Sequence, residues 1–250
     1  MNLSETIHSA IDFYAAPFYH LKKRLLRDGK EHPFALICPG GGYLMVCLHH
    51  EGMPLARKLN KEGFHVFLLS YRCAFNARYP HPQEDLDRAL RTIFENRKKW
   101  HIDMSSYSLW GFSAGGHLVS SFCTETDFSK KSYGKPHAIV LSYPVVTMGK
   151  KTHKDSRRRL LGRNPDPSLV DHLSVEKHIT KDYPRTFLWW GEDDDEVDPE
   201  NSLLLKKALD ENKVENIAIS YPGVKHGVSL GLDLPCRDWS DKAIAFVRKG

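Results

Sequence analysis

Short apolar runs recur along this chain, and amphipathic segments separate them. This alternation is typical of a mostly parallel β-sheet covered by helices on both faces. The apolar runs predict strands at residues 34–38, 65–70, 106–110, 138–142, 186–190 and 216–221. The amphipathic segments predict helices at residues 53–61, 83–98, 115–124, 199–211 and 237–249. We therefore expect an α/β fold with a doubly wound sheet.

One segment, residues 147–183, breaks this alternation. It is rich in charged and turn residues, and its apolar pieces, such as Leu160-Leu161 and Leu169-Val170, are short. A segment of this size cannot hold a hydrophobic core of its own. We therefore expect a single domain over residues 1–250. In it, residues 147–183 are an insertion between two strands that forms two short helices over the mouth of the site, as a candidate lid.

The composition is that of an ordinary soluble globular protein. Of the 250 residues, 41% are hydrophobic and 27% are charged, and the net charge is +5. No nucleic-acid-binding motif accompanies the basic residues, so a solvated helix face is the favoured interpretation and no nucleic-acid partner is expected. The excess positive charge gathers at Lys151, Lys154, Arg157, Arg158, Arg159 and Arg163.

Cysteine usage bears on the cellular compartment. The five cysteines are scattered and form no C-x-x-C pair, which favours a reducing compartment over a disulfide framework. Residues 1–8 lack the basic start and apolar run of a signal peptide. No apolar stretch approaches the ~20 residues that span a bilayer. We expect a cytoplasmic protein with no membrane partner.

The segment from Gly111 to Gly115 reads G-x-S-x-G, with a strand-like run before it and a helix-like run after it. In that context the motif predicts a nucleophile elbow, a sharp strand-to-helix turn that carries Ser113 at its tip. The serine of such a turn has a strained backbone, so small residues are needed two positions before and after it. Gly111 and Gly115 meet this requirement.

A serine hydroxyl needs a general base, and the base needs a carboxylate to orient it. In doubly wound hydrolases these partners follow the serine in the order acid, then histidine, each on a loop after a strand. The acidic run 192–196 follows the predicted strand 186–190, and His226 follows the predicted strand 216–221. The order and placement therefore favour a Ser–acid–His triad over a solvated turn and an ordinary surface histidine.

Three successive glycines follow the first predicted strand, at Gly40, Gly41 and Gly42. Glycines cost backbone entropy on folding, so such a run indicates a close approach of the backbone to a ligand. We expect the N–H groups of Gly41, Gly42 and Ala114 to form an oxyanion hole.

Several motifs in sequence order resemble those of α/β-hydrolase esterases related to hormone-sensitive lipase, above all the small bacterial carbohydrate (acetyl xylan-type) esterases. The resemblance covers about residues 30 to 230 and implies an α/β-hydrolase fold and hydrolysis of short acyl esters. The motifs are Pro39-Gly40-Gly41-Gly42-Tyr43, Glu51-Gly52, Tyr71-Arg72, Tyr79-Pro80 with Asp85, and Gly111-Phe112-Ser113-Ala114-Gly115-Gly116-His117.

The resemblance implies Ser113 as nucleophile, His226 as base and Asp194 as acid. Families of this kind place the acid three residues before a valine, here Val197. The chain departs from the usual pattern because Asp198 separates that valine from the next proline, so Asp195 remains the alternative acid.

Other residues near these motifs have expected roles. We expect Tyr43, Phe112 and Tyr143 to shape the substrate pocket together with the insertion. Arg72 and Asp85 are interpreted as a buried structural pair, and His117 as a structural partner rather than a second base.

The resulting hypothesis is a serine esterase that cleaves short-chain acyl esters, in particular acetyl esters, with sugar esters as candidate substrates. The acyl-enzyme mechanism needs no cofactor, and no metal-ligand pattern joins the histidines. Arylformamidases and small serine peptidases of the same fold remain alternatives because they share this chemistry. A non-catalytic, hydrolase-like binding protein is a further alternative. The partner expected is a small-molecule ester, and the sequence leaves open whether the chain forms a homo-oligomer.

Overall fold

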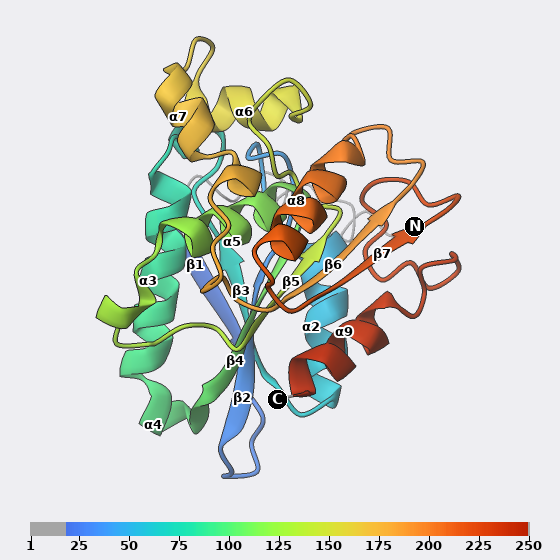
Figure 1. Cartoon of the computed structure of the whole chain (residues 1–250). Coiled ribbons are helices and arrows are strands. Elements are labelled where there is room, and N and C mark those ends of the chain that lie inside the picture. Colours follow the sequence, from blue (N-terminus) through green and yellow to red (C-terminus); the bar gives the residue numbers. More distant parts are fainter. Residues whose placement is uncertain (1–18, 250) are drawn as a thin grey trace, which may run out of the picture.

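The structure, a computed structural model, describes residues 19–249 and contains a seven-stranded sheet with helices on both faces (Figure 1). The strand order is β1-β3-β2-β4-β5-β6-β7. β1 is antiparallel to β3, and all other neighbouring strands are parallel. The strands are His20–Arg24 (β1), His32–Cys38 (β2), His65–Ser70 (β3), Ile102–Phe112 (β4), Ala138–Ser142 (β5), Thr186–Gly191 (β6) and Asn216–Tyr221 (β7).

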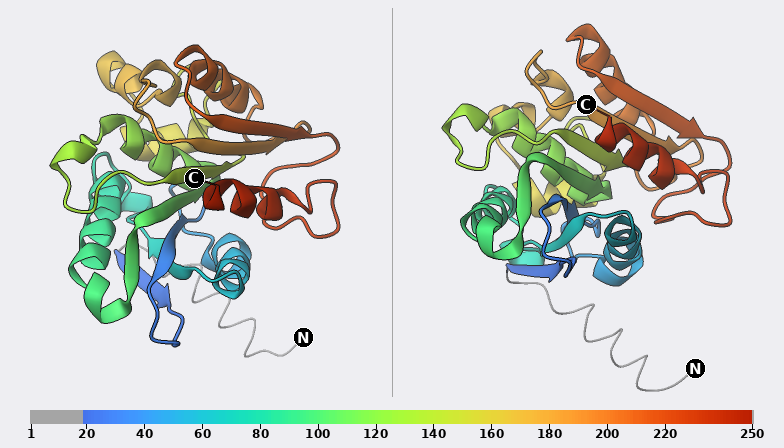
Figure 2. Two further views of the ribbon diagram at one scale, coloured as in Figure 1. Left: turned by 60° about the horizontal axis from the view of Figure 1, so that its bottom comes forward. Right: turned by 90° about the horizontal axis from the view of Figure 1, so that it is seen from below.

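Helices α2 (Met53–Lys61) and α9 (Trp239–Arg248) cover one face of the sheet (Figure 2). Lys58 of α2 lies 2.6 Å from Asp241 of α9, as expected for helices on the same side. The other face carries α3 (His81–Glu95), α5 (Ser113–Glu125) and α8 (Glu200–Glu211). The β2–β3 connection runs along the sheet in the opposite direction to the connections from β3 onward. Right-handed crossovers therefore place α2 on the opposite face from α3, α5 and α8.

Every residue of β3, β5 and β6 is buried, because helices cover both faces of these central strands. This explains why they appear in the sequence as continuous apolar runs. The indole rings of Trp189 (β6) and Trp239 (α9) stack with centroids 5.0 Å apart. Phe112, at the end of β4, packs edge-on against Trp239. These rings pack together in the core beneath the carboxyl end of the sheet.

The predicted mostly parallel sheet is confirmed; one expectation about its elements is wrong, and one strand was not predicted. The predicted helix 83–98 is two helices, α3 and the short α4 (Arg97–Trp100). At the break, the main-chain N–H and the side-chain amide of Asn96 both donate to the carbonyl oxygen of Thr92. The edge strand β1 was not predicted. None of its residues is fully buried and its sequence is highly charged, as suits an edge strand.

The segment between β5 and β6 contains α6 (Lys154–Leu161), α7 (Pro167–His172) and the short turn η4 (Val175–Lys177). Helices α6 and α7 lie at the top of Figure 1, beyond the carboxyl ends of the central strands. Three further single-turn helices connect the larger elements: η1 (Leu48–Gly52), η2 (Ala74–Asn76) and η3 (Phe128–Lys130).

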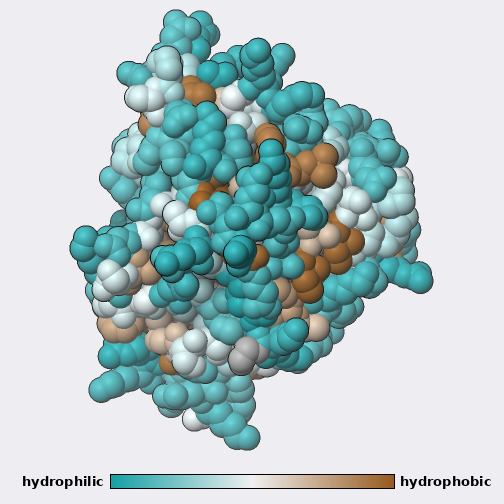
Figure 3. Space-filling view, viewed as in Figure 1, coloured by the Kyte–Doolittle hydropathy of each residue, from teal (hydrophilic) through white to brown (hydrophobic). Residues whose placement is uncertain are grey.

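The face shown in Figure 3 is mostly hydrophilic, with small and separate hydrophobic areas. None of the helices in residues 19–249 is long and apolar enough to cross a membrane. All five cysteines are free thiols. The large apolar side chains exposed in this part of the chain are Leu44, Phe75, Leu203, Ile217 and Leu232.

Candidate active site

Ser113 lies at the turn between β4 and α5, with its backbone in the left-handed region at φ 51°. The turn is tight enough that the glycines on either side have no room for a side chain. A β-carbon on Gly111 would lie 2.5 Å from the carbonyl oxygen of Gly115, and one on Gly115 would overlap the carbonyl oxygen of Cys38. The nucleophile-elbow geometry predicted from G-x-S-x-G is therefore present.

His226 and Asp194 lie on loops after β7 and β6; His226 reaches Ser113, and Asp194 reaches His226. The Nε2 atom of His226 lies 2.9 Å from Oγ of Ser113, and its Nδ1 atom lies 2.7 Å from Oδ2 of Asp194. The other carboxylate oxygen of Asp194 accepts hydrogen bonds from the N–H groups of Glu196 and Val197. All three side chains are buried or nearly so.

Asp195, the alternative acid, does not reach His226. Its side chain is exposed and lies 3.2 Å from the ammonium group of Lys225. The structure therefore brings Asp194, and not its neighbour, to the histidine.

The glycine loop lies directly against the elbow. A β-carbon on Gly40 would be 2.9 Å from the β-carbon of Ser113. Gly41 and Gly42 have φ angles of 122° and 62°, which L-residues with side chains rarely adopt. Within residues 19–249, the N–H groups of Gly41 and Gly42 have no hydrogen-bond acceptor. The N–H of Ala114 stands in the first turn of α5, where helical N–H groups lack a partner within the helix.

The three predicted substrate contacts, Tyr43, Phe112 and Tyr143, have fully buried side chains. The hydroxyl group of Tyr43 lies 2.9 Å from Nδ1 of His117, and that of Tyr143 donates to Glu51. Their burial is at odds with direct contact to a substrate. Aromatic residues beside the elbow lie beneath the site rather than in it, because the carboxyl ends of the central strands still belong to the core.

His117 is buried within α5 and acts as a structural partner, as expected. Its Nε2 donates to the carbonyl oxygen of Leu173, which requires the opposite ring nitrogen to accept from Tyr43. Burial lowers the pKa of His117 to about 4, so the ring is neutral in neutral solution. Arg72 and Asp85 also form the expected pair. Nε of Arg72 lies 3.0 Å from Oδ1 of Asp85, and the Asp85 carboxylate is buried.

The insertion contributes two residues to which the sequence gave no role in the site; Arg159 had been assigned to a solvated basic cluster. Nη1 of Arg159 donates to the carbonyl oxygen of Gly42, and the His153 ring lies beside the same glycine. Burial and the nearby His226 lower the pKa of His153.

Glu51 was quoted only as part of a motif, yet it lies buried beside the glycine loop. Glu51, His153 and Arg159 can be recognised only from their contacts with residues that lie far away in the sequence. Within residues 19–249, no three His, Cys, Asp or Glu side chains are placed to hold a metal ion.

Residues 26–209 match the family model described as BD-FAE. This chain belongs to the BD-FAE family. It is 36% identical over 226 residues to endo-1,4-beta-xylanase B of Butyrivibrio fibrisolvens, covering 86% of this chain and 35% of that protein. It is 30% identical over 198 residues to an acetylxylan esterase of Xylanibacter ruminicola, covering 77% of this chain and 40% of that protein. The chain thus spans well under half the length of these relatives.

Solved structures give the same assignment of fold. An acetyl ester-xyloside bifunctional hydrolase from Caldicellulosiruptor lactoaceticus superposes with a TM-score of 0.86 at 36% identity, covering 93% of this chain and 88% of that one. The carboxylesterase Cest-2923 from Lactobacillus plantarum superposes with a TM-score of 0.80 at 23% identity, covering 94% of each chain. The predicted α/β-hydrolase fold and the resemblance to carbohydrate esterases are confirmed for this BD-FAE member.

Proposed function

We propose that this chain is a serine carboxylic ester hydrolase that removes short acyl groups, in particular acetyl groups, from carbohydrate. The observation that carries the proposal is the continuous hydrogen-bonded chain from Ser113 through His226 to Asp194. This arrangement is the one that makes a serine hydroxyl nucleophilic at neutral pH.

In the first step, Oγ of Ser113 attacks the ester carbonyl carbon while Nε2 of His226 takes the hydroxyl proton. Asp194 orients the imidazole and stabilises the imidazolium. The tetrahedral oxyanion accepts hydrogen bonds from the N–H groups of Gly41, Gly42 and Ala114. The imidazolium then protonates the leaving alcohol as the C–O bond breaks, which leaves an acyl group on Ser113. A water molecule, deprotonated by His226, attacks the acyl-enzyme in the same way and releases the acid.

The carbohydrate part of the proposal rests on the relatives. One of them is named an acetylxylan esterase, and another an acetyl ester-xyloside bifunctional hydrolase. The insertion also brings polar side chains, His153 and Arg159, beside Gly42. Polar groups at the mouth of the site suit a hydroxylated alcohol half better than a long apolar chain.

The test compares the wild-type protein with Ser113→Ala on p-nitrophenyl esters from acetate to octanoate, on acetylated xylo-oligosaccharides, on formyl-kynurenine and on prolyl peptides. We expect acetyl esters to be the best substrates and Ser113→Ala to lose turnover while keeping its circular dichroism spectrum. A fluorophosphonate probe should label only the wild-type serine. An unlabelled wild type would favour a binding protein, and faster cleavage of formyl-kynurenine or peptides would favour an amide hydrolase.

A further inference from the structure

Glu51 is a buried carboxylate that the proposed mechanism does not use. It lies in η1 with 3% of its surface exposed, and it forms no ion pair with any residue in the range 19–249. A buried charge without a cation is costly unless hydrogen bonds compensate it. Its hydrogen-bond partners therefore indicate what it does.

Both oxygens of Glu51 accept hydrogen bonds from the site. The N–H of Gly40 donates to Oε2 at 2.5 Å, and the hydroxyl of Tyr143 donates to Oε1 at 2.9 Å. The Tyr143 oxygen itself accepts from the N–H of Ser229 at 3.3 Å, which leaves its proton for Glu51. An unprotonated carboxylate satisfies all of these donors at once.

Each partner of Glu51 touches one part of the catalytic arrangement. Gly40 precedes Gly41 and lies against Ser113, so its N–H fixes the glycine loop beside the nucleophile. The ring of Tyr143 packs against the imidazole of His226, with centroids 4.8 Å apart. The Tyr143 backbone has a φ of 38°, which a tyrosine adopts only where its surroundings hold it there.

The loop that carries His226 is also tied to η1. Nε2 of His50 lies 2.6 Å from the carbonyl oxygen of Gly227, and the hydroxyl of Ser229 donates to the carbonyl oxygen of His50. Glu51 thus lies where the glycine loop, Tyr143 and the loop that carries His226 meet.

We propose that Glu51 is a positioning residue, which locks the glycine loop and the Tyr143 support of His226 in one arrangement and supplies a buried negative charge to the imidazolium formed during turnover. This inference rests on the proposed function. The titratable groups that face Glu51 are Tyr143, His226, His50 and Cys47. The pKa of Glu51 is raised above its usual value because burial outweighs its two hydrogen bonds and the nearby histidines, which lower it.

The test is Glu51→Gln, which keeps the shape of the side chain and removes the charge. Asp85→Asn is the matched control, because Asp85 is equally buried and its carboxylate also accepts a main-chain N–H, that of Arg72, outside the site. Both variants are measured by urea unfolding and by the pH dependence of kcat and kcat/KM on p-nitrophenyl acetate.

For Glu51→Gln we expect kcat to fall about 10- to 100-fold with KM changed less than about 3-fold, because the substrate still binds but the transition state is less well stabilised. We also expect the acid limb of the kcat/KM profile to move to lower pH, since a neutral side chain no longer favours the imidazolium. Asp85→Asn should lose stability and keep both kcat and the position of the limb.

A merely structural role would give Glu51→Gln the behaviour of the control, and that result overturns the inference. If Glu51→Gln does not fold, Tyr143→Phe decides. It removes one donor and keeps the ring, so kcat should fall about 3- to 10-fold, and an unchanged kcat overturns the inference. A wild type that neither turns over esters nor reacts with a fluorophosphonate is a different result, because it removes the proposed function itself.

Discussion

The guanidinium group of Arg159 on α6 donates a hydrogen bond from Nη1 to the carbonyl oxygen of Gly42, 3.1 Å away. One end of this contact lies in the insertion and the other in the glycine loop. The contact holds the carbonyl group of Gly42 in place. The proposed oxyanion donors beside it are the N–H groups of Gly41 and Gly42. The insertion is therefore in direct contact with the glycine loop.

Replacing Arg159 by Ala removes this contact, and we expect kcat on p-nitrophenyl acetate to fall about 10-fold because the oxyanion donors are held less firmly. Arg158→Ala is the control, since that side chain is exposed and pairs with Asp155 on its own helix. Steady-state kinetics of both variants check the prediction. Equal kcat values for the two variants would show that the insertion does not support the glycine loop.

Asp194 and Asp195 differ in what they touch, so their variants should differ in activity. Asp194→Asn should lower kcat by about 10³- to 10⁴-fold, because the asparagine no longer holds the imidazole in the required tautomer or stabilises its charge. Asp195→Asn should stay within about 2-fold of the wild type, since a surface pair with Lys225 contributes little. A large loss in the second variant and not in the first would reverse the assignment of the acid.

The sequence predicted the central strands well because their burial on both faces leaves continuous apolar runs. β3 and β5 begin and end at the expected residues, and so does β7 at the edge of the sheet. β1 could not be predicted in this way, because an edge strand with four basic or histidine side chains gives no apolar run. The break between α3 and α4 depends on one side-chain hydrogen bond of Asn96, which no periodicity reveals.

In the site, the sequence order located the serine and the histidine, and the resemblance pointed to Asp194 as the acid with Asp195 as the alternative. The order alone does not separate neighbouring aspartates; in the fold, the N–H groups of Glu196 and Val197 hold the carboxylate of Asp194. Glu51 entered the sequence analysis only through the Glu51-Gly52 motif, which gave it no role. Its partner Tyr143 is 92 positions away along the chain, so only the fold brings the two together.

Gly115 tests the geometry of the elbow. A β-carbon there would overlap the carbonyl oxygen of Cys38 and lie 2.5 Å from that of Pro39, and neither backbone atom can move away without shifting β2. We expect Gly115→Ala to lower the free energy of unfolding by at least about 2 kcal/mol, as overpacking does. Gly149→Ala is the control, because its nearest neighbour is a side-chain oxygen at 3.2 Å. Urea unfolding measures both, and similar stabilities would contradict the close packing.

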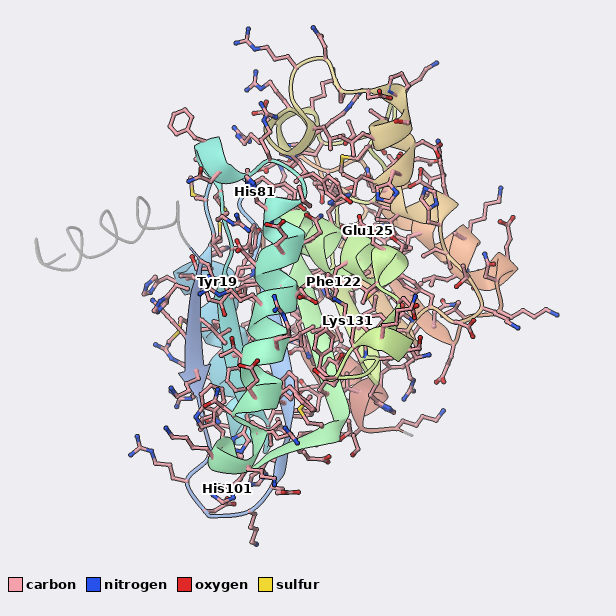
Figure 4. The ribbon with its side chains drawn as sticks, turned by 90° about the vertical axis from the view of Figure 1, so that its left-hand side faces the viewer. Tyr19, His81, His101, Phe122, Glu125 and Lys131 are labelled. Carbon is pink, nitrogen blue, oxygen red and sulfur yellow. The ribbon has the colours of Figure 1, made fainter. Side chains whose placement is uncertain are left out.

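Glu125 should make the stability of the protein depend on pH. It lies at the end of α5, on the side of the molecule shown in Figure 4. Its Oε2 accepts from the hydroxyl of Tyr79 at 3.3 Å, whereas Oε1 is buried without a hydrogen bond from any residue in the range 19–249. Burial raises the pKa of Glu125 from 4.5 to about 7.

The direction of this pH dependence follows from proton binding. Between pH 4.5 and about 7 the folded protein holds a proton on Glu125 that the unfolded chain has released. The free energy of unfolding therefore falls as the pH rises through this window, by on the order of 2 kcal/mol, and the loss is complete above it. Glu125→Gln is neutral at every pH and should escape this loss.

We therefore expect Glu125→Gln to match the wild type near pH 5 and to be more stable by on the order of 2 kcal/mol at pH 8. Urea unfolding at pH 5, 6, 7 and 8 measures the difference between the two proteins, which cancels the contribution of all other titrating groups. Glu31→Gln, at an exposed position, should show no such trend. A stability difference that is the same at pH 5 and pH 8 would contradict a raised pKa of Glu125 in the folded protein.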